Sequence, residues 1–198
     1  VPDFTAQFRS QHKWGHFQVA GILRRLGFDT ADTPDNEPKG HETGWGIDGT
    51  GSVKFGEKDQ LLLGVVYGHG IANYMNDGGT DLAAGGTLAN PEAEAVPLLG
   101  ISAYYDHYWS DKYSSSFGYS ETGVDNRSLQ AGDAFNTGRY ASANLLYYPT
   151  KNVFFGGELL WGQREDNDGS TGDDTRVQFS LHYSFSSKDI IGLKRNEE

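Results

Sequence analysis

The chain has no cysteine, only one methionine, and no apolar run long enough for a transmembrane helix. The absence of cysteine excludes disulfide scaffolds, thiolate metal sites and cysteine nucleophiles. Lysine and arginine total 16 against 27 aspartates and glutamates, and the formal charge is -11. Binding of nucleic acid depends on a surplus of basic residues, so we expect no nucleic-acid partner. We also expect no cofactor.

The residues that are abundant favour a β protein. The sequence contains 27 Gly, 11 Tyr, 11 Phe and 4 Trp, and this aromatic, glycine-rich composition is typical of β architecture. The low hydropathy of the chain does not exclude a barrel in the outer membrane, because only alternate strand residues of such a barrel touch lipid.

A period of two is clearest near the end of the chain, where residues 175–185 read TRVQFSLHYSF. Apolar or aromatic side chains alternate with polar ones, which is the pattern of a strand with two unlike faces. In a soluble protein the apolar row would face a core. In an outer-membrane barrel the apolar row would face lipid and the polar row a wet lumen.

The same pattern, with turn residues between the segments, predicts about nine strands. They cover residues 3–13, 17–28, 43–55, 60–75, 98–109, 113–123, 138–148, 153–165 and 175–185. Short and long connections alternate strictly, which predicts an antiparallel up-and-down meander with tight turns at one end and acidic loops at the other. This asymmetry is typical of transmembrane barrels of the outer membrane. We therefore expect an all-β fold in which residues 1–185 form barrel strands and loops and residues 186–198 a polar tail.

Aromatic residues gather near the predicted strand ends, as interfacial rings do at the two surfaces of a membrane. The short-turn group is Trp14, Phe17, Phe55, Tyr108, Trp109, Tyr113, Phe117, Tyr147, Tyr148, Phe154 and Phe155. The opposite group is Phe28, Trp45, Tyr74 and Trp161. These belts favour the membrane assignment, with apolar residues outward and polar residues inward.

The assignment divides the strand residues into two sets. The predicted outward set is Val177, Phe179, Leu181, Tyr183, Ile101, Ala103, Tyr105, Ala141, Ala143 and Leu145. The predicted inward set is Gln7, Arg9, Gln18, Arg24, Asp48, Thr50, Ser52, Lys54, Tyr104, Asp106, Ser142, Asn144, Glu158, Arg164, Arg176, Gln178 and His182. The pattern does not fix the parity of residues 60–75, which are nearly all apolar or glycine.

Three stretches resemble the DcaP-like family of Gram-negative outer-membrane porins: WGHFQVAGILR (14–24), YDHYWSDK (105–112) and ELLWGQRE (158–165). The resemblance implies a trimeric barrel in the bacterial outer membrane that passes small, mostly anionic solutes such as dicarboxylates. Its partners would be membrane lipid, lipopolysaccharide and those solutes. Family members carry further strands and an N-terminal helical segment, so the resemblance also implies that this chain is the C-terminal half of such a barrel.

Lumen-facing cations are the candidate solute-binding residues, because a guanidinium in a narrow wet path offers paired donors to a carboxylate. The candidates are the cations Arg9, Arg24, Arg164, Arg176 and Lys54, together with the lumen-facing Tyr104. The alternative is that Arg24 pairs with Asp48 and Arg164 with Glu158, which would make these arginines structural.

Two other classes of function stay open: an outer-membrane barrel enzyme of lipase or protease type, and a soluble ligand-binding β-barrel. No stretch groups Ser with His in a recognisable nucleophile motif. The acidic segment 165–174 fails the spacing of a calcium-binding EF-hand, and the six histidines lack the spacing of a zinc site. We therefore expect no catalytic or metal-binding residues and a passive channel, not an enzyme.

Overall fold

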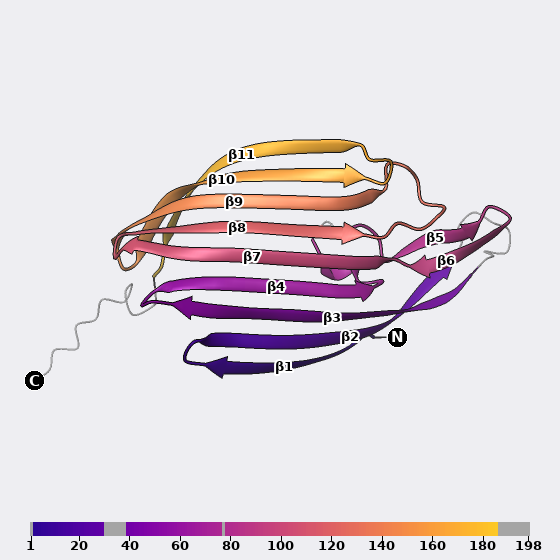
Figure 1. Ribbon diagram of the computed structural model, residues 1–198, viewed down its shortest axis with the longest axis horizontal. Helices are drawn as coiled ribbons and strands as arrows, with labels where there is room; N and C mark the ends of the chain where they lie inside the picture. Colours follow the sequence, from indigo (N-terminus) through magenta and orange to yellow (C-terminus); the bar gives the residue numbers. More distant parts are fainter. Residues whose placement is uncertain (1, 30–38, 77, 186–198) are drawn as a thin grey trace, which may run out of the picture.

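The computed structural model describes residues 2–29, 39–76 and 78–185, and these fold into two antiparallel sheets (Figure 1). The larger sheet has nine strands in the order β1-β2-β3-β4-β7-β8-β9-β10-β11, and the smaller is the hairpin β5-β6. The strands of the larger sheet are β1 (Phe4–His12), β2 (Gly15–Asp29), β3 (Lys39–Phe55), β4 (Asp59–His69), β7 (Pro97–Ser110), β8 (Tyr113–Val124), β9 (Phe135–Thr150), β10 (Val153–Asp166) and β11 (Thr171–Tyr183). Within these ranges no helix has the length and apolar character needed to cross a bilayer.

The nine strands confirm the meander that the alternating pattern predicted. Each strand of the larger sheet pairs with the next one along the chain, apart from the inserted hairpin between β4 and β7. All short turns lie at one end of the sheet, and the hairpin and the described long connections after β8 and β10 lie at the other (Figure 1). The sheet does not close on itself, so β1 and β11 are its edges. The predicted tail, residues 186–198, lies outside the described residues.

The segment after β4 differs from the prediction. The strand was expected to continue to residue 75, but it ends at His69 because Gly70 adopts a φ of 65°, in the left-handed region that favours glycine. A 3-10 turn, η1 (Ala72–Tyr74), follows it. The predicted loop at 76–95 contains the hairpin of β5 (Leu82–Thr87) and β6 (Asn90–Ala95).

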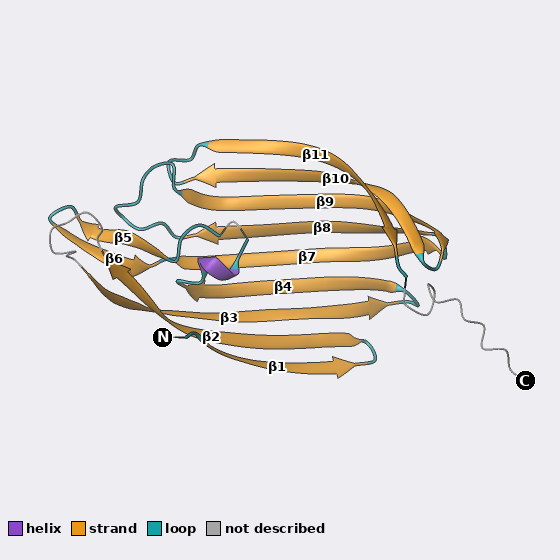
Figure 2. Cartoon of the chain, turned by 180° about the vertical axis from the view of Figure 1, so that it is seen from behind, coloured by secondary structure: helices purple, strands orange, loops and turns teal. Residues whose placement is uncertain are grey.

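The small buried core lies on the face of the sheet that carries η1 (Figure 2). Ile71, Ala72 and Leu98 are almost fully buried, and Leu98 is only 1% exposed. The partly buried residues packed against this core are Ile22, Val66, Met75 and Val124. We call this side of the sheet the inner face, and the opposite side the outer face.

Strand register assigns every residue of the large sheet to one of these faces. Paired residues lie on the same face, and the row Gln18, Thr50, Gly64, Ser102, Ser120 runs across five strands of the inner face. The predicted inward and outward sets both follow this register. It also settles the parity of residues 60–69: even-numbered β4 residues face inward and odd-numbered ones outward.

The outer face carries an exposed apolar band. The side chain of Val65 is 50% exposed and that of Leu159 is 52% exposed. Apolar side chains in the core of a soluble protein are far less exposed than this. Aromatic side chains border the band at both ends: Trp45, Tyr67, Tyr119 and Trp161 toward the long connections, and Phe17, Phe55, Trp109, Tyr113, Tyr147, Phe155 and Tyr183 toward the short turns. Beyond the first border the outward residues become polar, for example at Glu121 and Gln163.

Five residues of the predicted aromatic belts do not lie in the outer band. Phe28, Tyr108, Tyr148 and Phe154 have the parity of the inner face, and Phe154 stacks there on His182 with ring centroids 4.9 Å apart. Tyr74 belongs to η1. For the four strand residues, the position along the strand predicted the correct end of the sheet, but their parity places them on the inner face instead of the outer face.

Candidate functional site

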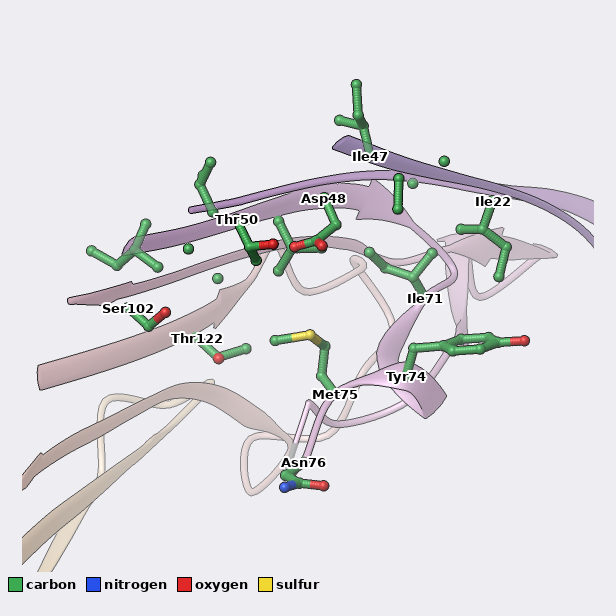
Figure 3. A pocket seen from close by; sticks show the side chains of 18 of the residues that line it. Ile22, Ile47, Asp48, Thr50, Ile71, Tyr74, Met75, Asn76, Ser102 and Thr122 are labelled. Carbon is green, nitrogen blue, oxygen red and sulfur yellow. The ribbon is translucent and has the colours of Figure 1, made fainter. Parts of the chain in front are cut away.

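The centre of the inner face is a hollow bordered by hydroxyl and carboxylate side chains on one side and by the segment after β4 on the other (Figure 3). We call residues 70–76 with 78–81 the inward segment. Asp48 and Thr50 of β3 and Ser102 of β7 point toward Ile71 and Met75, whereas Ile47 points away (Figure 3). The hollow has a volume of about 620 Å³.

A second hollow of about 950 Å³ lies next to the first. Both are lined by Asn76 of the inward segment and by Ser120 and Thr122 of β8. The second also reaches Arg164 and Asp174. The inward segment therefore borders both hollows and occupies part of the space along the inner face.

Arg24 of β2 holds the inward segment in place. Its Nε donates to Oδ2 of Asp3 at 2.9 Å, and its Nη1 donates to Oδ2 of Asp81 at 2.8 Å and to the carbonyl oxygen of Gly70 at 2.6 Å. The guanidinium carbon lies 5.0 Å from the centre of the Tyr74 ring. The arginine side chain is 9% exposed, so these charge-assisted bonds are largely shielded from water. We call these five residues the Arg24 clamp.

The clamp is also bonded within itself. Tyr74 donates its hydroxyl to Asp3 Oδ2 at 2.7 Å. The backbone N–H of Asn73, next to the clamp in sequence, donates to Asp81 Oδ1 at 3.0 Å. The Tyr74 hydrogen bond, with the bond and charge of Arg24, lowers the pKa of the Asp3 carboxyl. Because this pKa is lower in the folded than in the unfolded protein, the ionised Asp3 carboxyl stabilises the fold. This stabilisation is fully present at pH values above the pKa of the unfolded state, and it is lost as pH falls through the pKa of the folded state. Asp3 therefore stays ionised at neutral pH.

The six predicted solute-binding residues all lie on the inner face, but their surroundings differ. Arg24 is enclosed in the clamp. Arg164 bonds Asp166 at 2.6 Å and lies 5.8 Å from the centre of the Phe135 ring. Arg9 makes a long bond of 3.5 Å to Gln11. In the described part of the chain, neither Arg176 nor Lys54 forms an ion pair.

The two ion pairs that the sequence offered as structural alternatives are wrong. Arg24 pairs with Asp3 and Asp81 instead of Asp48. Arg164 pairs with Asp166 instead of Glu158. Glu158 accepts a hydrogen bond from the Gln178 amide at 2.6 Å. Asp48, Asp106 and Glu158 therefore add carboxylates to the inner face that no arginine of the described residues neutralises.

Tyr104 packs its ring across the neighbouring strand on Gly118, its partner in the register. A Cβ atom at Gly118 would overlap the ring, so only glycine lets Tyr104 lie flat against the wall. An aromatic ring over a cross-strand glycine stabilises a sheet at a position that glycine alone would weaken.

Gly118→Ala is expected to push the Tyr104 ring away from the wall and to destabilise the protein by about 1–3 kcal/mol, as overpacking does. Tyr104→Leu in the same background should recover part of the loss, because it removes the overlapping ring. Denaturant titrations of the single and double variants give the coupling. Strictly additive changes would contradict the contact.

Serine and histidine do meet in three places, which the sequence did not show. Ser10 with His12, Ser52 with His16, and Ser184 with His182 lie 2.8–2.9 Å apart. Within the described ranges no aspartate or glutamate bonds to any of these three histidines. The His107 ring bonds Asp59 at 2.7 Å and contacts the rings of Tyr105 and Trp109. Ser115 is the cross-strand partner of His107, but its hydroxyl accepts a hydrogen bond from Trp109 and none joins it to the imidazole. The described residues therefore form dyads and not a complete Ser-His-acid triad.

An antiparallel meander with an exposed apolar outer face and a polar inner face has the architecture of a transmembrane β-barrel wall. The fold is similar to one crystal structure in particular, that of the outer membrane channel DcaP of Acinetobacter baumannii. The TM-score is 0.81 at 19% sequence identity, and the match covers 93% of this chain and 52% of that channel. This chain thus spans about half the length of the channel it matches.

No protein-family model and no curated protein matches the chain. The structural match confirms the fold that the resemblance to DcaP-like porins implied, an antiparallel meander of the kind found in an outer-membrane barrel, here present as an open sheet. At this level of identity the likeness concerns the fold, and residue roles depend on the geometry of this chain.

Proposed function

We propose that this chain forms part of the wall of a barrel in the bacterial outer membrane, which acts as a passive channel for small hydrophilic solutes. The observation that carries the proposal is the opposite character of the two faces. An apolar band bordered by aromatic rings suits lipid, and a polar inner face with an inward-folded segment suits a wet path. The similarity to an outer membrane channel supports it.

Two features argue for a barrel with more strands than these nine. The edges β1 and β11 carry backbone donors and acceptors without partners in the described sheet, and such edges are not tolerated in the hydrocarbon region of a bilayer. The match also covers only 52% of the similar channel. Additional strands would pair with both edges and close the barrel.

We further propose that the channel favours anions. The support is the position of Arg9, Lys54 and Arg176 on the inner face, where no carboxylate of the described residues pairs with them. Other carboxylates, among them Glu92, Glu94, Asp133 and Asp168, lie on the hairpin and the long connections, where salt screens them over a Debye length of about 8 Å. Charges that line a confined path act more strongly on a permeating ion.

Replacement of Arg9, Lys54 and Arg176 with glutamine is expected to move the reversal potential under a salt gradient away from anion preference. Neutralising Glu92, Glu94 and Asp168 on the long connections should change it much less. A third variant, Asp48→Asn with Asp106→Asn, removes inner-face carboxylates and should strengthen the preference for anions. If the loop variant has the largest effect, the inner-face cations do not set selectivity.

A further inference from the structure

A row of hydrogen-bonding side chains crosses the inner face between its centre and the short turns. Its members, one on each of six neighbouring strands from β4 to β11, are Gln60, Asp106, Ser116, Asn144, Glu158 and Gln178. We call them the polar row. The Ser116 backbone N–H donates to Oδ1 of Asn144 at 2.8 Å, whereas no hydrogen bond or ion pair within the described ranges occupies the Asp106 carboxylate. The row therefore offers a free acceptor to a solute on the inner face.

Two aromatic rings flank the polar row along β7. Tyr104 lies two residues before Asp106 and Tyr108 two residues after it, so all three side chains point to the inner face. A strand rises about 3.3 Å per residue, which separates the Cα atoms of the two tyrosines by about 13 Å. Their partners on β8 are all small: Gly118, Ser116 and Ser114. The side chains of β8 therefore leave the space between the two rings open.

The ring of Tyr108 lies at a hollow of about 550 Å³ at the short-turn end of the inner face. Tyr108 and Tyr148 both line this hollow, and Tyr108 is 41% exposed. The Tyr148 hydroxyl lies 3.0 Å from Oγ of Ser114, a hydrogen bond that ties the Tyr148 side chain to β8. The other lining residues lie at or beside the short turns and include charges of both signs. A solute that enters this hollow therefore meets two tyrosine rings.

A sugar ring has surfaces that match both the rings and the polar row. Its C–H groups pack on the negative face of an aromatic ring, and its hydroxyls donate to carboxylate and amide oxygens. An anion is less suited, because Asp106 repels it, and Lys54, which continues the row on β3, lies two strands away from Asp106. A single sugar would reach only one ring, since about 13 Å separates the two tyrosines along β7. The order of ring, carboxylate and ring therefore fits a short chain of linked sugars.

We infer that the inner face of β7, β8 and β9 forms a binding track for a short neutral oligosaccharide. One sugar ring packs on Tyr104, another enters the hollow of Tyr108 and Tyr148, and the hydroxyls between them bond to Asp106 and Asn144. This site rests on the proposed function, which turns the inner face toward a water-filled path. It adds an uncharged class of solute to the anions.

Block of the ion current by a sugar tests the track. The protein purified from membranes is reconstituted into planar bilayers and titrated with maltotriose, a neutral linear oligosaccharide, which should reduce the current saturably. Tyr108→Leu should raise the half-blocking concentration about fivefold, because it removes one stacked ring. Asp106→Ala should raise it about tenfold, because it removes a charged acceptor. Tyr108→Phe keeps the ring and should stay within about twofold of the unaltered protein.

Tyr105→Leu is the matched control, since Tyr105 lies on the same strand between the two rings but points to the outer face. It should leave the half-blocking concentration unchanged. Polyethylene glycol of the same mass as maltotriose fills the same volume without sugar rings, so it should block less and should not respond to Tyr108→Leu. Equal block by the two molecules, or block by maltotriose that survives both Tyr108→Leu and Asp106→Ala, would overturn the track.

Calorimetry of maltotriose binding to the protein in detergent separates this site from the proposed function. Conductance without binding or block by maltotriose rejects the oligosaccharide track alone. Binding that Tyr108→Leu and Asp106→Ala weaken, in a protein that conducts no ions, rejects the channel alone.

Discussion

Arg24→Gln is expected to release the inward segment from the wall and to raise the conductance of the channel. The arginine is 9% exposed and bonds two carboxylates. Removing one member of a shielded charge cluster leaves the others without compensation, at a cost of several kcal/mol. We expect about 3 kcal/mol of lost local stability, which corresponds to amide exchange on the order of 100-fold faster at Asn73, Tyr74 and Met75.

Arg25→Gln provides the control for the clamp, because it removes the same charge from the adjacent residue. Arg25 points outward, and its one hydrogen bond in the described residues is a 3.2 Å contact with His41. We expect a change within about 0.5 kcal/mol, as for other surface positions, and an unchanged conductance. Equal effects of the two substitutions on amide exchange would show that Arg24 does not hold the inward segment.

Phe179→Arg is expected to destabilise the protein in bilayers by about 2–4 kcal/mol, the cost of a charged residue on the lipid face of a barrel near mid-membrane. Phe179 is 83% exposed on the outer face. The adjacent Gln178→Arg should be tolerated, because residue 178 faces inward and already bonds Glu158. Phe179→Leu keeps an apolar side chain and isolates the effect of charge from that of the lost ring.

Unfolding titrations of the three variants from bilayers give these free energies. Similar losses in Phe179→Arg and Gln178→Arg would contradict the assignment of the two faces. A loss in Phe179→Leu as large as that in Phe179→Arg would show that packing of the ring on Gly157, and not contact with lipid, determines the result.

The period of two predicted the nine strands and the faces of most of their residues. Successive side chains of a strand point to opposite faces, so two unlike faces leave an alternating pattern in each strand by itself. The prediction failed after β4 for a physical reason. The apolar residues Ile71 and Met75 continue the appearance of a strand, but Gly70 turns the chain and Ile71 packs on the inner core instead. Periodicity does not distinguish a side chain that faces lipid from one that fills such a core.

The clamp could not be predicted from spacing. Arg24 was identified as inward-facing, but its partners Asp3 and Asp81 lie 21 and 57 residues away. Their approach depends on the path of the inward segment, which no local pattern encodes. The hairpin β5-β6 was missed because its residues, rich in alanine, glycine and glutamate, have low β-propensity and lack two clear faces.

Cysteine labelling along β7 tests the account most directly, because the chain contains no cysteine of its own. Single substitutions Ile101→Cys, Ser102→Cys, Ala103→Cys and Tyr104→Cys are placed in the protein reconstituted into bilayers and exposed to a charged, membrane-impermeant thiol reagent. The account predicts that positions 102 and 104 react and that positions 101 and 103 do not, because the first pair faces a water-filled lumen and the second faces lipid. Reaction at 101 and 103, with 102 and 104 protected, would contradict it.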